Sequence, residues 1–187
     1  MTGIDLDNRA KQLATFALMI KACQKDSSFI DAHALPKVFT IPICDRYTWR
    51  DKAGHFNCHY KLQYTGDGSE LDNAFVLMEQ ADSLGSIMKF NISLPTRQYL
   101  LQAIESYDNH SSHEEDFTTL IDSFRLILAL SEKYTALVMN PPYMGGGNMN
   151  EKLSKYVKDN YEEGKADLFS VFMLLAIDKL QEDGKYG

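Results

Sequence analysis

The feature that most constrains the fold is an apolar run that ends in two consecutive prolines. Residues 136–139 (Ala-Leu-Val-Met) lead directly into Asn140, Pro141, Pro142 and Tyr143. An apolar run bounded by a turn signal predicts a buried strand. Neither proline can donate a hydrogen bond to a sheet, so the strand must end there. Asn140 is therefore predicted to lie just beyond the carboxyl end of a strand, the edge at which open α/β sheets bind ligands.

The residue types at this strand end suit the binding of a planar amine. The side-chain oxygen of Asn140 and the carbonyl oxygen of Pro141 can each accept a hydrogen bond from an amino group. The restricted φ of proline holds these acceptors rigidly. Tyr143 offers a flat face on which a planar ring can stack. A plain turn from strand to loop is the alternative, and the order of these four residues favours a binding site.

The run Asn140-Pro141-Pro142-Tyr143 resembles the catalytic motif of amino-methylating enzymes that use S-adenosylmethionine (SAM), above all the adenine-N6 DNA methyltransferases. The resemblance implies that an adenine flipped out of the DNA duplex stacks on Tyr143. It further implies that Asn140 and the Pro141 carbonyl bind the amine of this base, with Pro142 completing the motif. SAM is then the expected cofactor.

The first residues predict the end of another buried strand, over residues 3–7, and a helix over residues 7–23. Asp7 or Asn8 can cap this helix. An acidic residue that ends the second strand of a Rossmann-like sheet can accept hydrogen bonds from ribose hydroxyls, which makes Asp5 a candidate; a solvated carboxylate is the alternative. One face of the helix is expected to be buried, formed by Ala10, Leu13, Ala14, Phe16, Ala17 and Ile20.

Residues 3–10 (Gly-Ile-Asp-Leu-Asp-Asn-Arg-Ala) also resemble the second SAM motif of the same methyltransferases, in which the residue matching Asp5 binds the ribose. In that family a residue after the third strand contacts the adenine of SAM. Residues 38–43 predict this strand, so Asp45 is the candidate for the contact. Asp82 is the alternative.

We interpret residues 46–95 as an insertion beside the sheet. The first part of this segment is polar and aromatic, and it includes His55, Cys58 and His59, with Cys44 shortly before it. Residues of these types can bind zinc, but their spacing fits no common structural zinc site. We therefore expect no metal.

Helical spacing and turn signals predict the other elements. A turn is expected at residues 66–69, and helices are expected over residues 75–81, 96–107, 114–133, 150–159 and 166–180, with a further strand beginning at Tyr186. Lys152, Lys155 and Lys158 share the polar side of the fourth of these helices. Such a stripe is usually a solvated face, and contact with phosphates is the alternative.

Composition limits the other possibilities. The 187 residues are enough for one domain with a sizeable core. No apolar stretch approaches the ~20 residues of a membrane span, so no membrane contact is expected. Three cysteines without framework spacing indicate reduced thiols in the cytoplasm. The net charge of −7 argues against a duplex-binding surface over the whole chain, so DNA contacts must come from a local patch or from other sequence.

Two longer segments narrow the resemblance. Residues 140–153 and 166–173 (Ala-Asp-Leu-Phe-Ser-Val-Phe-Met) are similar to the large adenine-specific methyltransferases of phage-defence systems, the PglX type of BREX systems, and to fused restriction-methylation enzymes. The resemblance implies an α/β fold, a Rossmann-like SAM-dependent methyltransferase sheet with flanking helices. We expect residues 1–187 to be part of such a domain, incomplete at both ends, because the glycine-rich first motif is missing. Alone, this chain is expected to be weakly active or inactive.

Two other functions fit parts of the pattern. Asn-Pro-Pro-Tyr also serves methyltransferases that act on a protein glutamine or an RNA base, because any planar amide or amine suits the same acceptors. The residues after the motif favour DNA. The second alternative is a truncated, non-catalytic interaction domain, which would self-associate through an open sheet edge.

Overall fold

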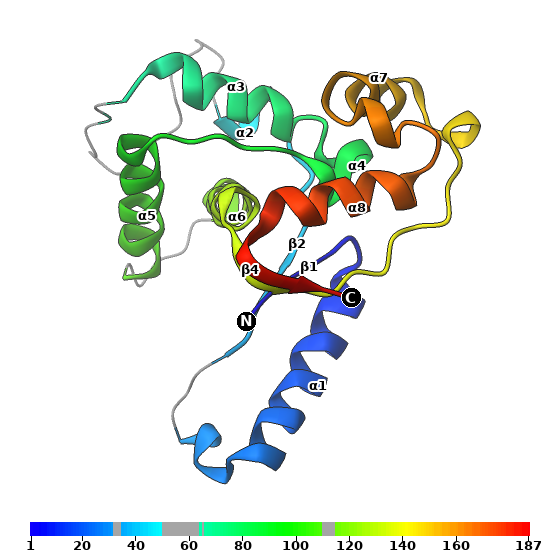
Figure 1. Ribbon diagram of the computed structural model, residues 1–187. Coiled ribbons are helices and arrows are strands. Elements are labelled where there is room, and N and C mark those ends of the chain that lie inside the picture. Colours follow the sequence, from blue (N-terminus) through cyan, green and yellow to red (C-terminus); the bar gives the residue numbers. More distant parts are fainter. Residues whose placement is uncertain (32–34, 50–63, 65, 110–114) are drawn as a thin grey trace.

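The computed structural model describes residues 1–31, 35–49, 64, 66–109 and 115–187, and it combines helices with short strands (Figure 1). The longer helices are α1 (Asn8–Lys25), α3 (Gly68–Met78), α5 (Leu94–Asp108), α6 (Glu115–Ser131), α7 (Glu151–Asn160) and α8 (Leu168–Lys179). The strands are β1 (Thr2–Asp5), β2 (Lys37–Thr40), β3 (Tyr134–Leu137) and β4 (Leu180–Tyr186). Single helical turns connect them: η1 (Ser27–Ile30), α2 (Arg46–Trp49), α4 (Ala81–Leu84), η2 (Gly85–Ile87), η3 (Gly146–Asn148) and η4 (Glu162–Gly164).

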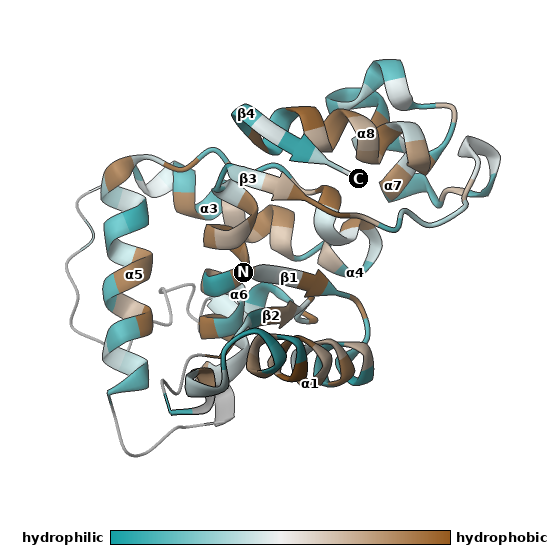
Figure 2. Cartoon of the chain, turned by 60° about the horizontal axis from the view of Figure 1, so that its bottom comes forward, coloured by the Kyte–Doolittle hydropathy of each residue, from teal (hydrophilic) through white to brown (hydrophobic). Residues whose placement is uncertain are grey.

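The described strands form two separate parallel pairs. β1 pairs with β2 from Thr2 opposite Lys37 to Asp5 opposite Thr40. β3 pairs with β4, and each pair is joined by a connection that contains helix, as parallel strands require. The arrows of β1, β3 and β4 point the same way (Figure 2). The fold is thus α/β with small parallel sheets, and the described residues do not show the continuous Rossmann-like sheet that we expected.

A single apolar core lies among the helices. Rings stack in its centre, with Trp49 4.6 Å from Phe75 and Phe75 6.1 Å from Phe124 between ring centroids. α6 lies at the middle of this core, and α5, α2 and β2 contact it. The core also includes Leu71, Met78, Ile87, Met88, Leu100, Ile121, Leu126, Ile127, Leu153, Val157, Leu168 and Val171.

The predicted insertion contributes to this core rather than lying apart from it. Trp49 from α2, Phe75 and Met78 from α3, and Ile87 and Met88 after α4 are all almost fully buried. Whether residues 46–95 are an insertion relative to other proteins stays a prediction. His55, Cys58 and His59 lie outside the described residues, and among those described no group of three or more possible ligands could hold a metal.

The prediction of a buried face on the first helix is wrong. α1 forms as expected, and the Asp7 carboxylate caps it by accepting a hydrogen bond from the Arg9 N–H at 2.6 Å. However, α1 has no buried residue, and Leu13, Phe16 and Ile20 are exposed. The reason is the position of the helix, whose main contacts are with β1, β2 and η1 (Figure 1).

The strand before Asn140 is also present but is not buried. β3 begins two residues before the predicted start, and Thr135 and Ala136 are exposed. Val138, just after it, is 88% exposed. β3 pairs with β4 alone among the described strands, so its other edge is open. Burial was the wrong part of this prediction, because it needed neighbours on both sides.

Other boundaries differ for local reasons. The turn expected at residues 66–69 is the beginning of α3, because the Asp67 carboxylate accepts a hydrogen bond from the Ser69 N–H and caps the helix there. β4 begins at Leu180 rather than Tyr186, with an irregular register between its two ends. The helices predicted over 96–107, 114–133, 150–159 and 166–180 are confirmed, with bounds shifted by one or two residues. No helix among the described residues is both long and apolar enough to span a bilayer.

Candidate active site

Asn140 stands where the β3 ladder ends. The Met139 N–H donates to the Gly187 carbonyl at 3.2 Å, and the Gly187 N–H donates to the Leu137 carbonyl at 3.0 Å. The two prolines after Asn140 have no N–H to continue the ladder. At the carboxyl end of the strand, Asn140 is exposed and Pro141 is half-buried.

The aromatic residue of the motif is open to solvent. Tyr143 is 96% exposed, and the part of the chain that the structure describes forms no wall over its ring. An exposed tyrosine ring costs hydrophobic free energy unless something covers it. A planar ligand could therefore stack on it without displacing any described side chain.

The loop after the motif is anchored to the start of α8. The Leu168 N–H donates to the Met144 carbonyl at 2.9 Å, and the Gly146 N–H donates to the Ala166 carbonyl at 2.7 Å. A Cβ at Gly146 would lie 2.8 Å from the Lys165 carbonyl oxygen, so only glycine permits this close approach. The anchor holds the position of the loop. Our sequence analysis did not assign this role to Gly146. The run of three glycines after Met144 was the feature that could have indicated it.

Asp5 lies at the carboxyl end of β1. Its Oδ1 accepts a hydrogen bond from the Asp7 N–H at 2.9 Å, and the exposed carboxylate has no other partner in the described chain. β1 and β3 run in the same direction (Figure 2), so Asp5 and Asn140 follow the same ends of their strands. Each candidate thus lies at the carboxyl end of a parallel strand, and the two strands belong to separate pairs among the described residues.

The two candidates for the adenine contact have different surroundings. Asp45 is engaged locally, since its Oδ1 accepts hydrogen bonds from the N–H groups of Tyr47 and Thr48 at 2.8 and 3.1 Å. Asp82 is exposed on α4, and no hydrogen bond or ion pair to its carboxylate is found among the described residues. α4 is followed by Gly85, whose Cβ position would be 3.7 Å from Leu6, next to the end of β1.

This chain is similar to known methyltransferases along its whole length. Residues 1–187 match the family described as Eco57I restriction-modification methylase. The chain belongs to this family. It is 30% identical to the adenine-specific methyltransferase PglX of Lacticaseibacillus casei (strain Zhang), over 91% of this chain and 14% of that protein. It is 27% identical to the adenine-specific methyltransferase BrxX of Escherichia coli O9:H4 (strain HS), over 97% of this chain and 17% of that protein.

The Eco57I-family chain thus spans less than a fifth of the length of these two relatives. Their activity as adenine-specific methyltransferases is that of much longer proteins. What the family match establishes for this chain is membership of a methylase family, and the match includes both sequence motifs, around Asp5 and around Asn140.

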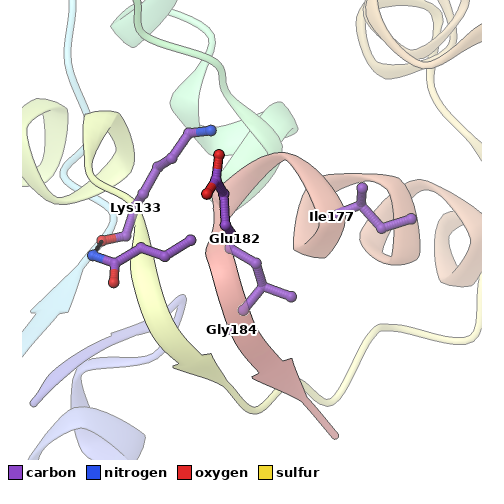
Figure 3. A pocket seen from close by; sticks show the side chains of 6 residues that line it. Lys133, Ile177, Glu182 and Gly184 are labelled. Atoms are coloured by element: carbon purple, nitrogen blue, oxygen red, sulfur yellow. Dashed lines mark hydrogen bonds between the residues drawn. The ribbon is translucent and has the colours of Figure 1, made fainter.

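A hollow in this methylase-family chain lies away from the candidate site. Its volume is about 620 Å³, and it is lined by Lys133, Ile177, Leu180, Gln181, Glu182 and Gly184. Figure 3 shows the Lys133 ammonium and the Glu182 carboxylate turned toward the same space. Lys133 precedes β3, so this hollow is at the opposite end of the strand from Asn140. Its lining residues Gln181, Glu182 and Gly184 lie in the part of β4 opposite the register shift between Tyr134 and Ala136.

Proposed function

We propose that this chain provides the catalytic part of an enzyme that transfers a methyl group from SAM to the N6 amine of adenine in DNA. The observation that supports this most is the position of Asn140-Pro141-Pro142-Tyr143, exposed directly beyond the carboxyl end of β3 in a chain of the methylase family. Both relatives are adenine-specific methyltransferases, which supports adenine as the base that is methylated.

Asn140 and Pro141 have the chemistry that an amine nucleophile needs. The Asn140 side-chain oxygen and the Pro141 carbonyl can accept the two amine N–H groups of adenine, which raises electron density on the nitrogen and orients its lone pair. A nitrogen–carbon bond then forms as the carbon–sulfur bond to the methyl group breaks. The electron pair of that bond stays on the sulfur, and the amine loses one proton to solvent. No covalent bond to the protein is required.

Tyr143 is proposed to stack on the extruded base. Flipping a base out of the duplex costs its stacking and pairing energy, which a stacking surface in the enzyme offsets in part. The ring of Tyr143 is 96% exposed and therefore available for this contact. Stacking of one base on an aromatic side chain typically stabilises a complex by about 1–3 kcal/mol.

SAM supplies the methyl group as an electrophile when it is bound. Asp5 fits its ribose, because the carboxylate is exposed at a strand end and uses one oxygen for a single backbone hydrogen bond. Asp45 was our first candidate for the adenine of SAM. We propose Asp82 instead, since its carboxylate has no described partner while that of Asp45 caps α2.

The finer fold assignment is part of the same proposal. β1 and β3 each have one paired edge and one open edge among the described strands, and their directions agree (Figure 2). These features support a Rossmann-like arrangement in which both pairs belong to one parallel sheet. Because DNA and SAM are found together inside the cell, we extend the proposal to a cytoplasmic location.

The test uses the polypeptide that contains this chain at its natural length, with labelled SAM and duplex DNA. We expect label in N6-methyladenine, and none in DNA whose adenines are already N6-methylated. Asn140→Ala should lower turnover by roughly 10²–10³-fold, the usual loss on removing one polar group that stabilises a transition state. Asn148→Ala, an exposed asparagine in the same loop, is the matched control and should retain turnover.

Cofactor binding is measured separately by calorimetric titration of SAM. We expect Asp5→Ala to weaken binding and Asp82→Ala to weaken it more than Asp45→Ala. Transfer of label to a glutamine-containing protein or to RNA instead of DNA would contradict the assignment of the substrate. Equal turnover in the Asn140→Ala and Asn148→Ala variants would contradict the assignment of the site.

A further inference from the structure

α7 is fixed to the rest of the molecule along one face. Leu153 and Val157 are buried, and the Tyr156 hydroxyl accepts a hydrogen bond from the Lys89 N–H at 2.8 Å. At the carboxyl end of the helix, the Lys89 ammonium donates to the Asn160 carbonyl at 3.3 Å. These contacts prevent the helix from turning about its axis, so its outer side presents one constant set of side chains.

Three lysines occupy that outer side. Lys152, Lys155 and Lys158 are exposed, and in the described part of the chain none of their ammonium groups forms an ion pair or hydrogen bond. Glu151 and Asp159 lie on the same helix, one at each end, and neither pairs with a lysine. At 1.5 Å of rise per residue, the three lysines span about 9 Å along the helix axis.

The charges on α7 act in both directions on its stability, since the lysines repel one another while Glu151 and Asp159 each lie four residues from Lys155. Like charges three residues apart on a helix repel each other and lower its stability. Elsewhere in the described chain, basic side chains near α7 are engaged, since Lys165 pairs with Glu162 and Lys89 lies 4.1 Å from the centre of the Tyr161 ring. Lys152, Lys155 and Lys158 have no such internal role.

The lysines follow the candidate site closely along the chain. Residues 144–150 alone separate Tyr143 from α7, and this loop is anchored to the start of α8. Figure 1 shows the loop running from the end of β3, beside the C label, to α7 at the top of the view. At the amino end of α7, the Asn150 side chain accepts a hydrogen bond from the Leu153 N–H at 2.8 Å, which fixes the junction of loop and helix.

We propose that Lys152, Lys155 and Lys158 bind the phosphate backbone of the DNA whose adenine enters the site at Asn140. This inference rests on the proposed function. Each ammonium group would neutralise a phosphate and release its counterions, a contact that positions DNA without reading its sequence. The chain as a whole has a net charge of −7, so attraction to phosphates must come from local basic surfaces, and these three exposed lysines form one of them.

The experiment measures the affinity for a duplex of about 30 base pairs by fluorescence anisotropy between about 50 and 200 mM salt, using the natural-length polypeptide. The test variant is Lys152→Gln, Lys155→Gln and Lys158→Gln combined. The matched control is Lys11→Gln, Lys21→Gln and Lys25→Gln combined, which removes the same charge from α1. The thermal midpoint is measured for all three proteins and should not fall in the test variant, because the repulsion is removed.

We expect the test variant to bind about 10- to 100-fold more weakly at low salt, with a log–log salt slope lower by about 3. The loss should be the same for every duplex sequence, and turnover at saturating DNA should persist. An unchanged slope, an equal loss in the control, or no DNA binding by the wild type would overturn the inference. If the wild type methylates adenine while the slopes are equal, this inference fails and the proposed function stands. If the wild type methylates nothing while the slope falls selectively, the proposed function fails and the lysines remain a nucleic-acid contact.

Discussion

Two helices of nearly equal length show how differently the chain uses similar sequences. α1 has 18 residues and α6 has 17, and apolar side chains recur at helical spacing in both. No residue of α1 is buried, whereas most of α6 from Leu120 to Leu130 is buried. The difference lies in their neighbours. α6 is surrounded by α5, α2 and β2, and α1 touches mainly one small sheet.

The comparison separates a packed part of the molecule from an open part. The packed part contains α3, α5, α6, α7 and α8, and the open part contains β1, α1 and the free edge of β3. The candidate residues lie in the open part or at its border, where Asp5, Asn140 and Tyr143 are all exposed. The packed part holds the loop that follows Tyr143 through the hydrogen bond from the Gly146 N–H to the Ala166 carbonyl.

The largest expected difference is in the loss of stability when each of two phenylalanines is replaced by alanine. Phe124 in α6 is 1% exposed and Phe16 in α1 is 64% exposed. Phe124→Ala should lower the free energy of unfolding by about 3–5 kcal/mol, because it leaves a cavity in the core. Phe16→Ala should change it by no more than about 0.5 kcal/mol. Chemical denaturation of both variants measures this. Equal losses of stability would show that another surface covers α1 in solution. The distinction between the packed part and the open part would then not hold.

A smaller difference is expected in the global stability that is lost when each of two helix-capping residues is replaced by alanine. The Asn150 side chain caps α7 in the packed part, and Asp7 caps α1 in the open part. Asn150→Ala should cost about 1 kcal/mol of global stability. Asp7→Ala should instead speed amide hydrogen exchange in α1, with little global effect, because an undocked helix opens locally. Asn150→Asp, which keeps an acceptor, is the control and should retain stability. A global loss with Asp7→Ala as large as with Asn150→Ala would contradict the separation.

The smallest expected effect is a pH dependence in the packed part. Burial opposes ionisation of Glu70, but hydrogen bonds from Ser93 and Thr96 outweigh it and lower the pKa of the Glu70 carboxyl. A carboxyl with a lowered folded-state pKa stabilises the protein fully above its unfolded pKa of about 4.3, and this stabilisation disappears as pH falls through the folded pKa. Because Glu70 is partly exposed, solvent screening keeps the effect small.

Urea denaturation from about pH 7 down to pH 3 in wild type and Glu70→Gln measures this contribution. The difference in stability between the two proteins should be constant above about pH 5 and should shrink below it. A difference that grows as pH falls would contradict the assigned direction of the shift.

Much of the candidate site could be predicted because its signals are local. Two prolines remove two donors, so the end of the strand at Asn140 is specified by covalent structure. Asp7 and the long helices follow from short-range capping and periodicity, and the structure confirms them. The family resemblance around Asn140 depends on contiguous residues as well, and the match over residues 1–187 confirms it.

Other features depended on local alternatives that the sequence leaves open, or on which distant segments meet. The role of Asp45 could not be decided from its position after β2, because the carboxylate turns back to cap α2 through Tyr47 and Thr48. The approach of Gly146 to the Lys165 carbonyl joins segments that the sequence alone does not bring together. The start of α3 depended on whether Asp67 formed a turn or a cap, and both use the same side-chain hydrogen bond.

The sequence by itself determined where most of the long helices form, where the β3 strand stops, and the residue types at its carboxyl end. These properties arise from backbone donors, φ restrictions and apolar spacing within a few residues. Only the tertiary structure decided that α1 and β3 are open while α6 is enclosed. Burial depends on the neighbours of a segment. An apolar stripe indicates that burying its surface is favourable, but it does not identify the segment that packs against it.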